Sequence, residues 1–229
     1  MANKKSIEER IEAEKQRTIA SKRKKLRFFA LGSLLLAAVI LLMMLMNWAA
    51  ISNTDIPGNE VEISGFNCVS AALSGNYKSM DEGRFGNIAV FNYHAAAYTE
   101  RLAVVSAVAM FVVIAHLLVA LFGWISNKQK VFNPLNVAFA VAEAGLFIAC
   151  HALALSIKDS GILTTYCNNN PACSVQSQAI VAGLIALLSV ALPVISMILD
   201  KKVVLEAESA ALSAAKTPVS VGKKRKNRR

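Results

Sequence analysis

Four long apolar runs constrain the fold of this chain more than any other feature of its sequence. They cover about residues 28–46, 102–125, 134–157 and 175–199. Each is long enough to cross a hydrocarbon layer of roughly 30 Å as a helix rising 1.5 Å per residue. Only 17% of the 229 residues are charged, against roughly 25% in soluble domains. The sequence therefore predicts an all-α membrane protein built as a four-transmembrane-helix bundle.

The first run has a competing interpretation as a cleavable signal peptide, because a basic segment precedes it and Ala49 and Ala50 follow it. Signal-peptide cores have about 7 to 15 apolar residues and end at a small-x-small site. This run is longer, and the bulky Trp48 stands two residues before Ala50. We therefore expect a retained span, with Asn47 and Trp48 at the membrane interface.

Basic residues define the orientation of the spans. Residues 1–27 carry ten Lys or Arg and four Glu, residues 126–133 carry two Lys and no acid, and residues 200–229 carry nine basic and three acidic residues. Residues 47–101 instead carry six acidic and three basic residues. Because positively charged flanks remain in the cytoplasm, we expect both termini there, with loops 47–101 and 158–174 outside a plasma membrane.

The chain thus divides into a basic N-terminal helix (1–27), a membrane domain (28–199) and a basic tail (200–229). Near a bilayer, each Lys or Arg is attracted to anionic headgroups by about 1 kcal/mol. The residues predicted to contact anionic lipid are Lys22, Arg23, Lys24, Lys25, Lys223, Lys224, Arg225 and Lys226. No aromatic side chain interleaves with the tail to stack on bases, which disfavours nucleic acid as a partner.

The first outer loop is too long to be a simple turn. Residues 61–66 alternate in the manner of a strand before polar, Gly-dotted sequence. We expect a small extracellular cap, part strand and part short helix. Whether this cap is a partner-facing surface or an unspecialised ordered loop stays open at this stage.

Three of the four cysteines lie in the expected outer loops. Cys167 and Cys173 bracket a turn-rich Asn and Pro stretch, which predicts a local disulfide in an oxidising exterior. A bridge from Cys68 to one of these two is the rival connectivity.

The third run carries a stripe of small residues. Steps of four and three residues place them along one side of a helix, and small side chains allow close helix packing in lipid. The predicted packing seam comprises Ala138, Ala142, Gly145, Ala149, Ala152 and Ser156.

Polar side chains occupy the opposite side of this run. Asn136, Glu143 and Cys150 recur every seven residues, with His151 beside the last. A charged group in mid-bilayer costs several kcal/mol unless it is paired or neutral. His116 and Glu143 are equidistant from the centre of the loop between the second and third runs, so they lie at equal depth in an antiparallel hairpin. We expect them to form an intramembrane polar pair.

The sequence contains no metal cluster, phosphate loop or catalytic set, so it predicts no cofactor and a non-enzymatic protein. The favoured function is a structural or accessory tetraspan with a membrane-protein partner or a second copy of itself. The alternative is a small transporter or channel subunit that uses the Glu143 and His116 pair, with Pro193 kinking the fourth span. A membrane thiol oxidoreductase is the remote third, because the chain lacks the Cys-x-x-Cys dithiol of such enzymes.

In outline, four spans with a large first outer loop and inward termini resemble the claudin and peripheral-myelin class. Members of that class carry a Trp, Gly-Leu-Trp, Cys and Cys signature in this loop. Here the loop has Trp48 and Cys68 but no Gly-Leu-Trp run and no second cysteine. We therefore assign no family from the sequence.

The charge distribution makes a direct prediction about topology. Reporter tags placed before residue 1 and after residue 229 should both resist external protease in intact cells, because basic flanks hold both ends inside. A C-terminal tag that is cleaved from outside would require an odd number of spans and contradict the prediction.

Overall fold

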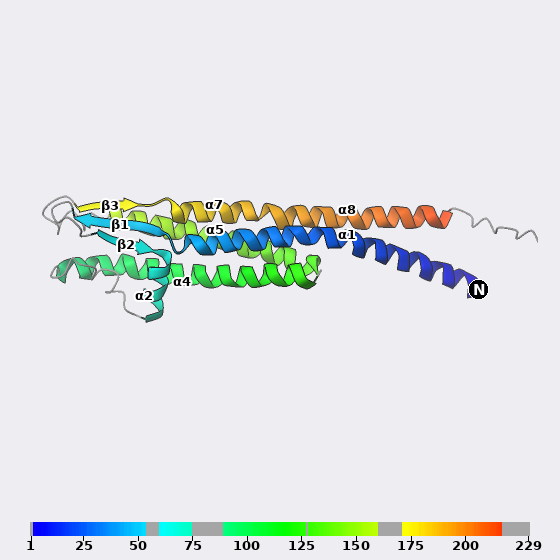
Figure 1. Cartoon of the computed structure of the whole chain (residues 1–229), viewed down its shortest axis with the longest axis horizontal. Helices are drawn as coiled ribbons and strands as arrows, with labels where there is room; N and C mark the ends of the chain where they lie inside the picture. The colour runs from blue at the N-terminus through cyan, green and yellow to red at the C-terminus, as the bar shows by residue number, and fades with distance from the viewer. Residues whose placement is uncertain (1, 54–59, 75–88, 127, 160–170, 217–229) are drawn as a thin grey trace, which may run out of the picture.

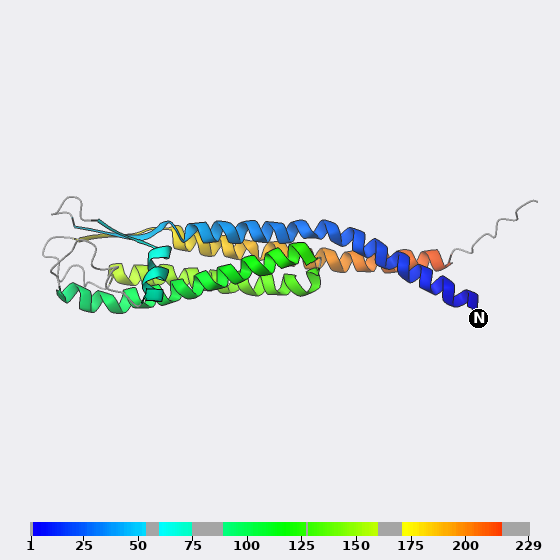
Figure 2. The same ribbon diagram turned by 60° about the horizontal axis from the view of Figure 1, so that its bottom comes forward.

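The structure is a computed structural model that describes residues 2–53, 60–74, 89–126, 128–159 and 171–216. Four helical spans lie side by side along its long axis (Figures 1 and 2). They are α1 (Ala2–Met43), α4 (Ala89–Ser126), α5 (Gln129–Asp159), and α7 (Gln178–Ser189) continued by α8 (Ala191–Lys216). All four are long and apolar enough to cross a membrane. The predicted four-helix bundle is confirmed.

The four spans form a ring. α4 packs between α1 and α5, and the α7–α8 span packs against the same two helices from the other side. α1 and α5 therefore lie across the diagonal and touch each other little. In such a ring each helix turns one side inward, and the opposite side faces lipid.

This geometry overturns the predicted packing seam on α5. Ala138, Ala142 and Ala152 are exposed, and a Cβ added at Gly145 would meet no atom within 4 Å. The remaining two seam residues, Ala149 and Ser156, are half-buried. The polar groups on the opposite side of α5 explain this rotation. They cannot face lipid without a large cost, so they point inward and the small residues point outward.

The fourth span is interrupted near its middle, between Ser189 and Ala191. Pro193 has no backbone N–H to donate to the carbonyl of Ser189, the acceptor four residues earlier. Val190, between the two helices, keeps helical dihedral angles of φ −59° and ψ −33°. The break is therefore local, and α8 continues in the general direction of α7 (Figure 1).

Two helices extend past the bundle as a stalk, formed by the first part of α1 and the last part of α8 (Figures 1 and 2). The predicted N-terminal helix is thus continuous with the first span. Three ion pairs link the stalk helices: Lys15 with Glu208 at 3.4 Å, Lys22 with Glu206 at 2.8 Å, and Arg23 with Asp200 at 2.6 Å. The hydrogen bond from Lys22, together with its charge, lowers the pKa of the Glu206 carboxyl.

The outer end carries the expected cap of strands and a short helix. Its antiparallel sheet has the order β2-β1-β3, where β1 is Asn47–Asn53, β2 is Glu60–Ser64 and β3 is Pro171–Val175. Helix α2 (Gly65–Ser74) follows β2 and packs against α4. The strand predicted at 61–66 is observed at Glu60–Ser64, slightly earlier in the sequence. The pairing of β3 with β1 connects the second loop to the first.

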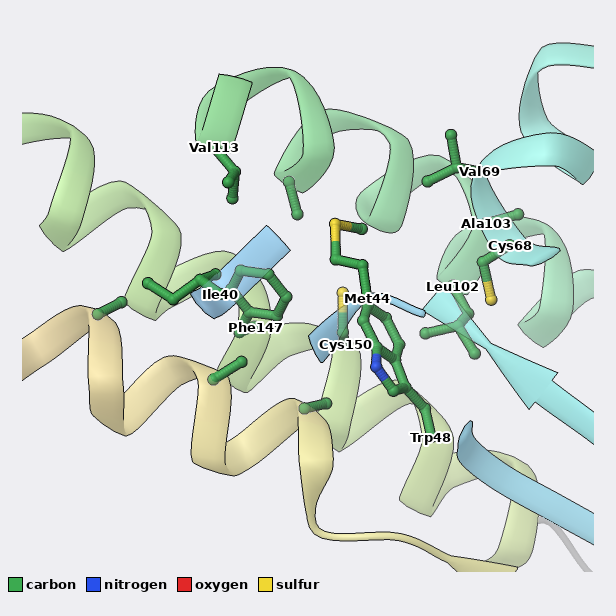
Figure 3. Packing of buried hydrophobic residues seen from close by; sticks show 14 of the residues in the cluster. Ile40, Met44, Trp48, Cys68, Val69, Leu102, Ala103, Val113, Phe147 and Cys150 are labelled. Atoms are coloured by element: carbon green, nitrogen blue, oxygen red, sulfur yellow. The ribbon is translucent and has the colours of Figure 1, made fainter. Parts of the chain in front are cut away.

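Trp48, which the sequence predicts at the membrane interface, is buried within the protein and anchors the cap in the bundle. It is 1% exposed, and its ring meets Phe147 of α5 edge to face, with centroids 5.9 Å apart (Figure 3). Its indole N–H donates to the carbonyl of Met43 at 3.3 Å, so the polar end of the ring is satisfied on burial. Around it the core of the outer half comprises Ile40, Met44, Leu102, Val113 and other buried side chains.

Gly65 provides a sharp test of this anchor. A Cβ at Gly65 would lie 2.8 Å from Cε2 and 2.9 Å from Cη2 of Trp48. Gly65→Ala should therefore lower stability in detergent by about 1 to 3 kcal/mol through overpacking, measured by thermal unfolding monitored with tryptophan fluorescence. Gly145→Ala is the matched control, because its Cβ meets nothing within 4 Å. Equal effects of the two substitutions would contradict the packing of Trp48 on Gly65.

Candidate functional site

The inward side of α5 carries a row of buried polar side chains. Asn136 is 1% exposed, and Glu143 and Cys150 are 0% exposed. The seven-residue spacing of these three returns each of them to nearly the same side of the helix. The sequence pattern thus identified the polar row, and the structure places it on the interior side of this span.

His116 of α4 and Glu143 of α5 are brought together at the centre of this row. Nδ1 of His116 lies 2.9 Å from Oε1 of Glu143, and the two side chains are 1% and 0% exposed. The contact is one hydrogen bond, whether its proton is carried by the ring or by the carboxyl group. Equal depth in the α4–α5 hairpin predicted this contact, and the structure places the two groups accordingly.

Phe139 completes the surroundings of the imidazole. It stands four residues before Glu143 on α5, one helical turn away. Its ring stacks on that of His116 with an interplanar angle of 16° and a centroid distance of 6.3 Å. One helix therefore supplies both the hydrogen-bonding partner and the apolar face that hold His116 in one orientation.

Several polar atoms of the row have no hydrogen-bond partner among the described residues. They are Nε2 of His116, Oε2 of Glu143, and both amide atoms of Asn136. A buried polar group without a partner costs about 1 to 3 kcal/mol. Such groups can be satisfied by water or can hold a transported ion, so this row is the part of the bundle with a capacity for chemistry.

The row continues toward the stalk through residues for which the sequence predicted no interior role. Asn133 of α5 donates from Nδ2 to Oγ of Ser196 on α8 at 2.9 Å, and both residues are buried. Below them Arg23 donates to both carboxylate oxygens of Asp200, at 2.6 and 3.2 Å. One signal was available for Ser196: it is the only polar residue between Val190 and Leu199.

At the outer end the row contains thiols. The hydroxyl of Ser106 donates to the carbonyl of Leu102 at 2.6 Å, and its oxygen lies 3.7 Å from the sulfur of Cys150. Cys68 and Cys150 are free thiols and are buried. Desolvation raises the pKa of Cys68 to about 12, so its thiolate is scarce at neutral pH and its nucleophilicity is low.

The other predicted site residues have varied surroundings. His151 is half-buried, and its Nδ1 has no partner among the described residues. Cys173 lies in β3, while Cys167 falls outside the described residues, so their disulfide stays a prediction. Within the part of the chain that the structure describes, no three His, Cys, Asp or Glu side chains gather to hold a metal ion.

The predicted lipid-contact residues also separate into groups. Lys22 and Arg23 pair with Glu206 and Asp200, so their charges are matched within the stalk. Lys24 and Lys25 are exposed. The four residues in the C-terminal tail, Lys223, Lys224, Arg225 and Lys226, lie outside the described residues.

Comparison of the chain with protein-family models, with curated proteins and with solved structures found no match.

A double-mutant cycle tests the pairing of His116 with Glu143. Each of His116→Leu and Glu143→Leu leaves the partner buried and unpaired, so each should lower the stability of the protein in detergent by about 1 to 3 kcal/mol. The double variant should lose less than the sum, with a coupling energy of about 0.6 to 1.7 kcal/mol, the range typical within membranes.

His151→Leu serves as the control for this cycle. His151 lies eight residues from Glu143 on α5, roughly 12 Å along the helix axis, and side chains so separated act independently. The cycle of Glu143→Leu with His151→Leu should give a coupling energy near zero. An equally small coupling energy for Glu143→Leu with His116→Leu would reject the pair.

Proposed function

We propose that this protein is a non-enzymatic structural or accessory tetraspan of the plasma membrane, with both termini in the cytoplasm. Its bundle holds an outer cap in a fixed position for contact with another membrane protein. The observation that carries this proposal is the attachment of the cap: strands from both outer loops form one sheet, and the first strand inserts Trp48 into the core of the bundle.

Hydrogen bonds connect the cap to the span ends as well. The backbone N–H of Phe66 donates to the carbonyl of Met44 at 2.8 Å, and that of Gln176 donates to the carbonyl of Trp48 at 2.8 Å. These bonds join the turn after α1 to α2, and β1 to the segment that leads into α7. A cap fastened at both of its connections moves with the bundle, which suits a fixed interaction surface.

The cap also presents apolar side chains outward. On α2, Cys68, Val69 and Ala71 are buried, whereas Phe66 is 52% and Leu73 is 66% exposed. Phe66 and Leu73 are seven residues apart and share one side of the helix. Large exposed apolar side chains at the outer end of a bundle are typical of contact surfaces.

The buried pair fits the role of structural glue. His116 and Glu143 are joined by a hydrogen bond between Nδ1 and Oε1 across α4 and α5, and the ring of Phe139 stacks on the imidazole. Three hollows lined by described residues lie toward the cytoplasmic end, and neither His116 nor Glu143 lines any of these three. The high pKa of Cys68 also weighs against the thiol oxidoreductase hypothesis.

A small transporter or channel subunit is the second candidate. Its support is the row of unpartnered polar atoms on His116, Glu143 and Asn136 along the inside of one span. A proton path through a membrane uses side chains of these types in such an arrangement.

Purified protein in liposomes discriminates the two functions. We expect the same proton permeability for empty liposomes, for the wild type and for Glu143→Gln, measured with a trapped pH-sensitive dye under an imposed pH gradient. A flux that the wild type supports and that Glu143→Gln abolishes would overturn the structural proposal and favour the transporter.

The interaction role has its own test in native membranes. A photo-crosslinking amino acid at position 66 or 73 should give a discrete protein adduct from cells, because both side chains point outward from the cap. The control is position 118, where Leu118 of α4 is 50% exposed on a span expected to face lipid. Adducts at 118 alone, or only lipid adducts at 66 and 73, would contradict a partner at the cap.

A further inference from the structure

A hollow at the cytoplasmic end of the bundle has the composition of a ligand site. Its volume is about 360 Å³, and it lies between the start of α5 and the middle of α8. The residues that line it are Lys130, Asn133, Met197, Asp200 and Lys201. This is an unusual set, with two cations, an amide and an apolar side chain in one place.

The positive charge in this hollow is uncompensated. Asp200 is 6% exposed and accepts two hydrogen bonds from Arg23, so its carboxylate is already matched. Lys130 and Lys201 are exposed and make no ion pair with any described residue. The hollow therefore has two ammonium groups available for an anion. Asp200, the one acidic residue in its lining, is already paired with Arg23 of α1.

Asn133 adds a buried amide group, of which one polar atom has a hydrogen-bond partner and the other has none among the described residues. Its side chain is 1% exposed, Nδ2 donates to Ser196, and Oδ1 has no hydrogen-bond partner among the described residues. The amide can turn by 180° and still bond to the Ser196 hydroxyl, because a hydroxyl both donates and accepts. Its second polar atom can therefore accept from a ligand hydroxyl or donate to a ligand oxygen.

The position of the hollow indicates what kind of anion would reach it. The third span begins at Lys130, and the fourth passes from the apolar Met197 to Asp200 and Lys201. This change from apolar to charged residues marks the level of the lipid headgroups. A molecule there has its charged part beside the lysines and its apolar part beside Met197.

We propose that this hollow binds the phosphate headgroup of an anionic glycerophospholipid. Lys130 and Lys201 donate to the phosphate oxygens, and Asn133 bonds to the phosphate or to a headgroup hydroxyl. Met197 contacts the glycerol end of the acyl chains. The site differs from the general attraction of the basic tails, because it places specific donors around one headgroup.

Native mass spectrometry of delipidated protein in a neutral detergent tests this site. We expect one tightly bound phosphatidylglycerol or phosphatidylinositol per chain and much weaker retention of phosphatidylcholine, which has no net charge. Lys130→Gln combined with Lys201→Gln should weaken binding by about 30-fold, the product of two headgroup contacts. The matched control combines Lys128→Gln with Lys202→Gln, which removes the same charge from exposed neighbours that do not line the hollow and should change binding less than threefold.

The outcomes separate the proposal from its rivals. Equal losses in the two double variants would show a general charge effect and overturn the site, as would equal retention of phosphatidylcholine. A parallel arm measures the binding of inorganic phosphate alone. If free phosphate binds as tightly as the lipid, the hollow is a site for free phosphate and not for a lipid headgroup. Thermal unfolding of both double variants should match the wild type, so that a loss of binding reports on the site.

Discussion

The cost of placing polar side chains in hydrocarbon determines how this bundle is arranged. Asn136, Glu143 and Cys150 all lie on one side of α5, and lipid offers these groups no hydrogen bonds. That side must therefore turn inward, where His116 on α4 meets Glu143 at 2.9 Å. Once the rotation of α5 is fixed, its stripe of small residues has to point out of the bundle, although small residues favour close helix packing. The polar requirement outweighs the packing advantage because an unpaired buried group costs more than one close helix contact contributes.

Outside the lipid, different interactions hold the two ends of the bundle. At the outer end, antiparallel strands satisfy their backbone groups in one sheet, and Trp48 connects that sheet to the core. At the end that carries the stalk, Arg23 and Asp200 form a bidentate pair beside the last apolar residues of the fourth span. The stalk beyond it depends on exposed pairs such as Lys15 with Glu208, each of which contributes little alone. The inner pair and the Trp48 anchor are therefore the principal fixed points of the molecule.

Much of this arrangement could be predicted from the sequence. The four spans follow from apolar length, the polar row on one side of α5 from the spacing of Asn136 and Glu143, and the depth of His116 from the loop position. The orientation of the seam could not be predicted, because the sequence shows two special sides of one helix and does not rank them. The burial of Trp48 could not be predicted either: the interface preference of tryptophan concerns only its depth, whereas its insertion into the core depends on β1 folding back over the bundle. The sheet joins residues about 120 positions apart, such as Ile51 and Cys173, and no local pattern encodes such a pairing. The hollow beside Asn133 likewise combines two helices that are distant in sequence.

The rotation of α5 is the central claim, and oxygen accessibility of nitroxide labels measures it directly. Single cysteines replacing alanines along this helix, in a background without the native cysteines, would carry the label in liposomes. We predict high collision rates with dissolved oxygen at the exposed positions 138, 142 and 152, and low rates at the buried positions 140, 144 and 154. The opposite phase, with 140, 144 and 154 accessible, would place the small residues inside and the polar row in lipid, and would contradict the account.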